Sequence, residues 1–231
     1  MISNRIIDVI IPAFNEEKAI GAVLREIPKD LVRTIILADN NSTDNTSREA
    51  EKYGATVVFQ PNAGYGNACL KAMEHIAQQK EKPTIVVFLD GDHSDFPEQM
   101  RELVAPVIND KADLVIGSRA LGKSESGSMT PPQLFGNWLA TRLLKLFYGV
   151  KFTDLGPFRA IRYSSLLELK MQDRNYGWTV EMQIKAAKLK FRCMEIPVDY
   201  RVRIGQSKVS GTIKGVMGAG YKIIFTLFRY L

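Results

Sequence analysis

The segment Thr84-Ile85-Val86-Val87-Phe88-Leu89-Asp90-Gly91-Asp92 decides how this chain is interpreted. Its first six residues suit a strand that is buried on both faces, because such strands read as nearly continuous apolar runs. The run then ends in two carboxylates that one glycine separates. Ligands of open parallel sheets bind beyond the carboxyl ends of the strands, so we expect Asp90 and Asp92 to lie beside a cleft.

Two interpretations of this carboxylate pair stay open on the segment alone. Neighbouring carboxylates repel each other unless a cation or hydrogen-bond donors compensate their charge. A divalent ion that holds a diphosphate would do so, since Mg²⁺ and Mn²⁺ favour oxygen ligands and keep positions for substrate phosphates. Asp-Gly-Asp is also ordinary turn chemistry at the end of a strand.

Strand and helix patterns alternate through the first half of the chain. Runs rich in Val and Ile predict strands at Ile6–Ala13, Thr34–Ala38, Thr56–Gln60, Thr84–Asp90 and Asp113–Ser118. The segments between them predict helices at Glu16–Ile27, Asp44–Tyr53, Gly66–Gln79 and Pro97–Ile108. Repeated βα units with short connections predict an α/β fold with a doubly wound, mostly parallel sheet.

The second half is less regular. It predicts strands at Phe158–Arg162 and Cys193–Val198 and a helix at Val180–Leu189. Two further helices, Gln133–Tyr148 and Thr212–Leu231, are unusually apolar and carry aromatic and basic residues. Such helices either pack on the sheet or lie in the interface of a membrane.

Charge is divided unevenly along the 231 residues, whose net charge is +6. Residues 1–118 carry 12 basic and 18 acidic side chains, a net charge of −6, whereas residues 119–231 carry 19 and 7, a net charge of +12. The basic half is either a solvated surface or faces an anionic partner such as phosphate groups, a membrane surface or nucleic acid. Nucleic acid is the weakest of these, because the first half is acidic.

The expected lack of targeting signals and the spacing of the cysteines predict a cytoplasmic protein. The chain passes directly into its first strand, so we expect no signal peptide. We also expect no spanning helix, which would need about 18 or more consecutive apolar residues. Cys69 and Cys193 lie far apart without metal-ligand spacing, as in a reduced protein.

Four more polar segments follow predicted strands or lead into helices, and could converge on Asp90 and Asp92. Ile11–Glu17 opens a helix whose N-terminus points backbone N–H groups at this edge. Asp39–Asp44 has polar side chains suited to a base or ribose, and the glycines of Asn62–Ala68 allow close backbone approach. Arg119 can fork onto a phosphate. Ligand-suited residues at the ends of four strands are improbable for a purely structural sheet, so their joint order predicts a ligand site.

This set of segments resembles the glycosyltransferase family 2 proteins, which have the GT-A fold, and especially the dolichyl- and polyprenyl-phosphate sugar synthases. Pro12–Glu17 is similar to the nucleotide-binding opening motif. Asp39–Thr46 is similar to Asp-Asp-Gly-Ser-x-Asp-x-Thr, whose first acid reads the base. Asp90 and Asp92 match the metal-binding Asp-x-Asp, and Gly117–Arg119 matches a motif whose arginine approaches phosphate.

The resemblance covers nearly the whole chain. Asp154–Arg159 is similar to the acceptor-side aspartate segment, Tyr176–Glu181 to a later acidic element, and Arg203–Lys208 to the Arg-x-x-Gly-x-Ser-Lys signature that contacts pyrophosphate and lipid phosphate. The chain departs from the family pattern at three places, which are Asn40 for a second acid, Ser94 for a metal-contacting glutamine, and Gly156-Pro157 for Ser-Gly.

The resemblance implies a metal-dependent, inverting hexosyltransferase that moves a sugar from a nucleotide diphosphate to an acceptor, with Mg²⁺ or Mn²⁺ on Asp90 and Asp92. Asp154, Glu181 and Arg119 are the expected catalytic residues. The residues expected to contact the donor are Pro12, Ala13, Asn15, Glu16, Asp39, Asn62, Gly66, Asp90, Arg203, Ser207 and Lys208.

The resemblance also implies one GT-A domain over residues 1–231. Its nucleotide-sugar half would be 1–118 and its acceptor half 119–211, with an amphipathic C-terminal helix at 212–231. The favoured acceptor is polyprenyl phosphate, reached by peripheral contact with the inner face of the membrane. The alternatives are a soluble glycan or small-molecule acceptor, a sugar-nucleotide nucleotidyltransferase, and a non-catalytic nucleotide-sugar binder.

Overall fold

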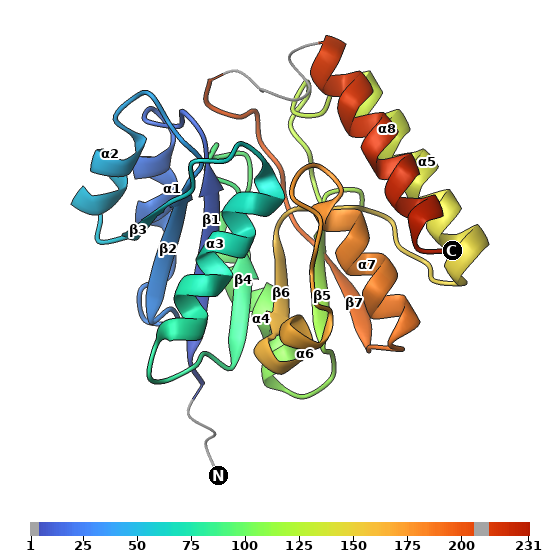
Figure 1. The fold of residues 1–231 in the computed structure, drawn as a ribbon, viewed down its shortest axis with the longest axis horizontal. Coiled ribbons are helices and arrows are strands. Elements are labelled where there is room, and N and C mark those ends of the chain that lie inside the picture. The colour runs from blue at the N-terminus through green and yellow to red at the C-terminus, as the bar shows by residue number, and fades with distance from the viewer. Residues whose placement is uncertain (1–4, 206–212) are drawn as a thin grey trace.

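Figure 1 shows a central sheet with helices on both faces, in a computed structural model that describes residues 5–205 and 213–231. The strands of the described residues form one seven-stranded sheet in the order β3-β2-β1-β4-β6-β5-β7. They are β1 (Ile7–Ala13), β2 (Thr34–Asp39), β3 (Thr56–Phe59), β4 (Ile85–Phe88), β5 (Leu114–Ser118), β6 (Arg159–Arg162) and β7 (Cys193–Pro197).

The helices cover the sheet in the order that the alternating pattern predicts. They are α1 (Ile20–Glu26), α2 (Thr46–Lys52), α3 (Tyr65–Gln78), α4 (Met100–Ile108, after a 3₁₀ turn at Pro97–Gln99), α5 (Pro131–Tyr148), α6 (Tyr163–Glu168), α7 (Trp178–Lys188) and α8 (Ile213–Arg229). The mostly parallel α/β sheet is confirmed. The pattern missed α6, whose six residues are too few to show a helical period.

Strand β6 runs antiparallel to both of its neighbours, β4 and β5. The chain leaves β5 at the carboxyl edge, forms α5 and re-enters the sheet from that same edge, so β6 must run in the opposite direction. Strands β1, β2, β4 and β5 still end at one edge, at the top of Figure 1. The insertion of β6 therefore leaves the predicted ligand edge intact.

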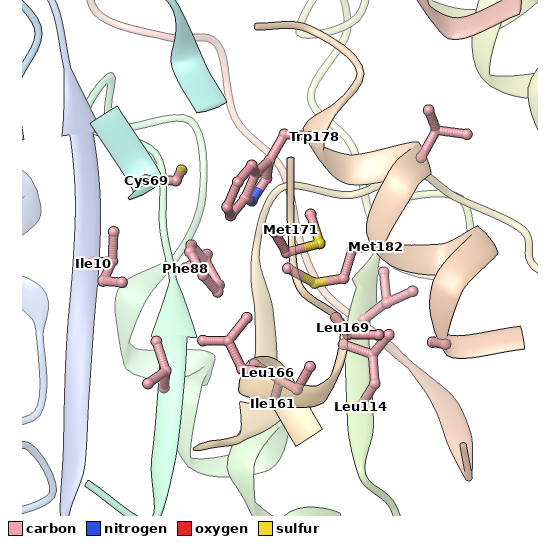
Figure 2. Packing of buried hydrophobic residues seen from close by; sticks show 14 of the residues in the cluster. Ile10, Cys69, Phe88, Leu114, Ile161, Leu166, Leu169, Met171, Trp178 and Met182 are labelled. Atoms are coloured by element: carbon pink, nitrogen blue, oxygen red, sulfur yellow. The ribbon is translucent and has the colours of Figure 1, made fainter. Parts of the chain in front are cut away.

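Alternate residues of the central strands pack into two separate cores. Ile7, Val9 and Ile11 of β1 face the core that α1, α2 and α4 cover, whereas Ile10 faces the core under α3 and α7. Figure 2 shows the second core, where the Trp178 ring lies above Phe88 at a centroid distance of 5.9 Å. Because both faces are covered, the strands read as continuous apolar runs.

Helices α5 and α8 lie side by side beyond β7, as Figure 1 shows. Helix α5 begins after Thr130, whose backbone N–H donates to Gln133 Oε1 (2.8 Å), and ends at Gly149, which has a φ of 69°. The Phe147 and Phe228 rings join the two helices at 5.5 Å, and the Tyr148 hydroxyl donates to Leu227 O (2.6 Å). Within the described residues, no helix is both long and apolar enough to span a bilayer.

Candidate active site

The polar residues predicted after separate strands meet at the carboxyl edge of the sheet. Ala13 ends β1, Asp39 ends β2, Asp90 follows β4, and Arg119 follows β5 directly. A loop brings Arg203 to the same edge. Ile204 N, next to Arg203, donates a hydrogen bond to Asp92 O (3.0 Å), which fixes this loop beside Asp92. Segments more than a hundred residues apart thus form one site.

The carboxylates of Asp90 and Asp92 carry incompletely compensated negative charge. Burial and the neighbouring charge of Asp92 raise the pKa of Asp90 to about 7, although Tyr65 donates a hydrogen bond to Asp90 Oδ1 (3.1 Å). Asp92 Oδ1 accepts from the backbone N–H (3.0 Å) and the hydroxyl (2.5 Å) of Ser94. Asp92 Oδ2 lies 3.1 Å from Arg203 Nη1.

This pair fits a divalent cation that a substrate phosphate would share. Both side chains offer oxygen ligands, and burial together with the charge of Asp92 raises the pKa of Asp90, which is an effect that a bound cation would offset. Within residues 5–205 and 213–231, no cluster of three or more His, Cys, Asp or Glu side chains could hold a metal. Mg²⁺ sites in proteins commonly combine one or two carboxylates with water and substrate phosphate oxygens, which is a set that this pair could begin.

A cavity of about 450 Å³ opens on this pair. It is large enough for a drug-sized ligand. Its wall includes residues at or after the ends of β1, β2 and β4, together with the segments around Tyr65, Tyr176 and Arg203. They are Pro12, Ala13, Phe14, Glu16, Asn40, Ala63, Gly64, Tyr65, Ala68, Asp90, Gly91, Asp92, Asn175, Tyr176 and Arg203.

A second cavity of about 290 Å³ adjoins the first and shares Tyr65, Asp90 and Tyr176 with it. Residues of α5 and α8 line this cavity, and so does Arg119. Arg119 is held by Asp154, which accepts from Arg119 N (2.8 Å), Nε (2.8 Å) and Nη2 (2.7 Å). Burial alone would lower the pKa of Arg119, but the hydrogen bonds and charge of Asp154 raise it, so the guanidinium stays charged.

Comparison with known proteins identifies the family of this site. Residues 8–170 match the sequence profile of glycosyl transferase family 2. The chain belongs to this family. A protein from Mycobacterium tuberculosis, named an uncharacterized glycosyltransferase, is 34% identical over 211 residues, which are 90% of this chain and 92% of that protein.

Other similar proteins carry more specific names. The dolichyl-phosphate hexose transferase of Haloferax volcanii is 31% identical over 87% of this chain and 85% of its own length. Glucosyl-3-phosphoglycerate synthase from Mycobacterium tuberculosis, solved with Mn²⁺, uridine diphosphate and phosphoglyceric acid, superposes with a TM-score of 0.77 over 99% of this chain and 79% of that chain. At 22% identity, this likeness shows that the family 2 chain has the GT-A fold.

Several predicted donor contacts of this family 2 protein hold loops in place. Asn15 has a φ of 54°, and its side-chain oxygen accepts from Thr43 N (2.8 Å), which ties the loops after β1 and β2 together. Asp39 Oδ2 accepts from the Ser47 hydroxyl (2.5 Å), and Asn62 O accepts from Asn40 Nδ2 (2.7 Å). Contact of these residues with a nucleotide stays a prediction.

Asp154 and Glu181 sit differently from the general bases that the sequence suggested for the family 2 enzyme. Asp154 is fully buried, with both oxygens engaged by Arg119. Glu181 is also fully buried and accepts from the Tyr230 hydroxyl (2.6 Å), from Lys185 Nζ (2.7 Å) and from backbone N–H groups. Both carboxylates are engaged by their protein neighbours in this structure, and a catalytic role for either stays a prediction.

The site contains residues that sequence reasoning missed or placed differently. Tyr65 lies within the predicted segment Asn62–Ala68, and Asn175 directly precedes Tyr176–Glu181, but neither residue was predicted individually as a site residue. Asp95 is 2% exposed, and neither of its carboxylate oxygens has a hydrogen-bond partner among the described residues. Burial and the charges of Asp90 and Asp92 raise its pKa. Predicted Ser207 and Lys208 lie outside the described residues.

Proposed function

We propose that this family 2 glycosyltransferase moves a hexose from a nucleoside diphosphate sugar to a polyprenyl phosphate, with inversion at the anomeric carbon. The observation that carries the proposal is the junction of the two cavities at Tyr65, Asp90 and Tyr176. A transferase must bring donor and acceptor together at the reacting carbon. The larger cavity would hold the donor and the smaller one the acceptor.

On the donor side, Asp90 and Asp92 would hold Mg²⁺ or Mn²⁺. The ion would neutralise the charge that develops on the departing diphosphate. Arg203 would add positive charge beside it, since its Nη2 donates to Glu16 Oε1 (3.0 Å) and its Nη1 lies against Asp92. Arg203 Nε is buried and has no hydrogen-bond partner among the described residues, so it is available to a phosphate oxygen.

On the acceptor side, Arg119 would bind the phosphate of the acceptor. A phosphate monoester is already ionised near neutral pH, so this acceptor needs positioning rather than a general base. One of its oxygens would form the new bond to the anomeric carbon as the bond to the diphosphate breaks. The engaged carboxylates of Asp154 and Glu181 are consistent with an acceptor that keeps no proton to remove.

The lipid part of the acceptor is supported by the apolar surface of α5 and α8. Half of the large apolar side chains that are exposed in the described chain belong to these two helices, and on α8 they recur at helical spacing. They are Leu134, Phe135, Trp138 and Leu146 on α5, and Tyr221, Ile224, Phe225 and Phe228 on α8. Basic Arg142, Lys145 and Arg229 flank them, as in helices that lie in an anionic membrane surface.

Similarity to named relatives points to the same acceptor class. The dolichyl-phosphate hexose transferase of Haloferax volcanii is one such relative. The undecaprenyl-phosphate mannosyltransferase of Micrococcus luteus, 28% identical over 89% of this chain, is another. We propose that the protein works from the cytoplasmic side at the membrane surface.

Two experiments test the proposal. The first follows nucleoside diphosphate release from UDP- and GDP-hexoses with Mn²⁺ or Mg²⁺, comparing polyprenyl phosphate with 3-phosphoglycerate as acceptor. We expect polyprenyl phosphate, and not 3-phosphoglycerate, to increase the release of nucleoside diphosphate. An increase with 3-phosphoglycerate and not with polyprenyl phosphate would assign a soluble acceptor.

The second experiment is flotation with anionic vesicles. Trp138→Glu combined with Phe225→Glu should reduce binding, whereas Phe59→Glu should not, because Phe59 is equally exposed (54%, against 52% for Trp138) but lies on β3. Equal binding of all three proteins would contradict membrane contact through α5 and α8.

A further inference from the structure

The segment 173–177 lies where the two cavities meet. Asn175 and Tyr176 belong to the wall of the donor cavity, and Tyr176 also belongs to the wall of the acceptor cavity. Asn175 and Tyr176 share the donor cavity with Phe14 and Glu16, which follow β1 in a segment predicted to contact the nucleotide, and they share it with Asp90 and Asp92. A donor with its diphosphate at Asp90 and Asp92 would therefore place its sugar beside Asn175 and Tyr176.

Hydrogen bonds within the segment fix its backbone. Asp173 Oδ1 accepts from Asn175 N (2.7 Å) and from Gly177 N (3.1 Å), so the chain turns back over this side chain. Arg174 O accepts from Asn67 N (3.0 Å) at the start of α3. Asn175, which is itself exposed, is thus presented on a rigid turn rather than on a loose loop.

Close packing against α3 restricts the segment further. A Cβ atom on Gly66 would lie 2.0 Å from Asp173 O, and one on Gly64 would lie 2.1 Å from Arg174 O. Real Cβ atoms essentially never come that close, so glycine is required at both positions. The glycines expected to admit the nucleotide admit this segment in the structure.

Glu181 and α8 hold the base of the segment. Glu181 accepts from Gln172 N (3.0 Å) and Asp173 N (2.7 Å), and Lys222 Nζ lies 3.1 Å from Asp173 Oδ2. Two buried carboxylates, Glu181 and Asp173, are thus used to shape five residues. Such a firmly held turn at the junction of two ligand cavities is what precise positioning of a substrate requires.

We propose that residues 173–177 select the donor sugar, with Asn175 and Tyr176 as specificity-determining residues and Glu181 as a positioning residue. An amide side chain donates and accepts hydrogen bonds, and so can distinguish the hydroxyl groups of one hexose from those of another. Tyr176 reaches both cavities and sets how far the sugar extends toward the acceptor. This inference rests on the proposed function, since it needs a nucleotide-sugar donor.

The test measures binding of UDP, UDP-glucose, UDP-galactose, GDP and GDP-mannose by calorimetry with Mn²⁺. Asn175→Ala should weaken binding of the preferred nucleotide sugar about threefold to tenfold, which corresponds to the loss of one hydrogen bond. The affinity for the free nucleoside diphosphate should not change. It should also narrow the ratio of kcat/KM between UDP-glucose and UDP-galactose. Gln172→Ala is the matched control, because its exposed side chain precedes the segment and lies in neither cavity wall.

Two further variants keep the inference testable. Tyr176→Phe should change the same ratio through loss of one hydroxyl, even if Asn175→Ala folds poorly. Glu181→Gln should raise KM for the nucleotide sugar without removing a limb from the pH profile of kcat, as expected for positioning rather than proton transfer.

The possible failures are distinguishable. If wild-type protein binds none of the nucleotides or nucleotide sugars, the proposed function itself is wrong. The other failure requires that wild-type protein binds a nucleotide sugar. If Asn175→Ala and Tyr176→Phe then lower the affinities for the nucleotide sugar and for the free nucleoside diphosphate equally, or change neither affinity, the segment does not select the sugar.

Discussion

Replacing Asp154 with asparagine separates a positioning role for this residue from a base role. Asp154 and Arg119 are 1% and 12% exposed in their side chains, and three hydrogen bonds join them. Asparagine keeps one acceptor but leaves the guanidinium charge unpaired in a buried site. Breaking a buried pair from one side costs about 3 kcal/mol. For a chain of this size that corresponds to a melting temperature lower by about 6–12 °C.

The assay is thermal unfolding of Asp154→Asn, with steady-state kinetics of the same protein at several pH values. We expect the loss of stability and a higher KM for polyprenyl phosphate, because Arg119 would no longer be held in place. Asp113→Asn is the matched control, since its pairing with Arg192 is a surface one (17% and 49% exposed) and is worth at most about 1 kcal/mol. Unchanged stability with loss of the acidic limb of the kcat profile would refute this reasoning and make Asp154 a base.

Three further changes have definite expected results. Gly66→Ala should destabilise the protein by about 1–3 kcal/mol through overpacking, because its Cβ would meet Asp173 O. Urea unfolding measures this against Gly218→Ala, because Gly218 of α8 has open space around it and no positive φ. Arg192 hydrogen bonds hold the folded-state pKa of Asp113 at about 2, below the ordinary value of 3.8. The resulting stabilisation should be present above about pH 4 and be lost as the pH falls toward 2, so the small stability gap between wild type and Asp113→Asn should close over that range in acid titrations followed by circular dichroism. Asp90→Asn should remove the stabilisation that wild-type protein gains from added Mn²⁺, and an equal Mn²⁺-induced shift in both proteins would contradict a metal role for Asp90.

Local sequence patterns predicted most of the strands and helices of the fold. The apolar runs of β1 and β4 predict strands because each strand is buried on both faces, and the polar residues that follow them predict the edge where ligands bind. Strand β6 was also found, but its direction depends on where the chain re-enters the sheet, and no local pattern records that.

Within the candidate site, the proximity of residues that are close in sequence could be predicted, whereas contacts between distant segments could not. Asp90 and Asp92 stand at the end of one strand, so their proximity follows from spacing alone. The Arg119–Asp154 pair joins residues 35 positions apart, and Gly66 meets Asp173 only after the sheet has formed. The motifs therefore predicted ligand contacts for these carboxylates and glycines. In this structure Asp154 binds Arg119, Glu181 accepts hydrogen bonds from Asp173 and Gln172, and Gly66 packs against the 173–177 segment.

The most direct test of the central claim is nucleoside diphosphate release by wild-type protein and Asp92→Asn, with and without divalent cation and polyprenyl phosphate. Asp92 does not contact the proposed acceptor cavity but lines the donor cavity beside Asp90. We expect wild-type release to require Mn²⁺ or Mg²⁺ and to rise with polyprenyl phosphate, and Asp92→Asn to lose at least about 100-fold in rate, as for removal of one main electrostatic contributor. Release that is unaffected by the metal and by Asp92→Asn would contradict the assignment of the carboxylate pair as the metal site of a sugar transferase.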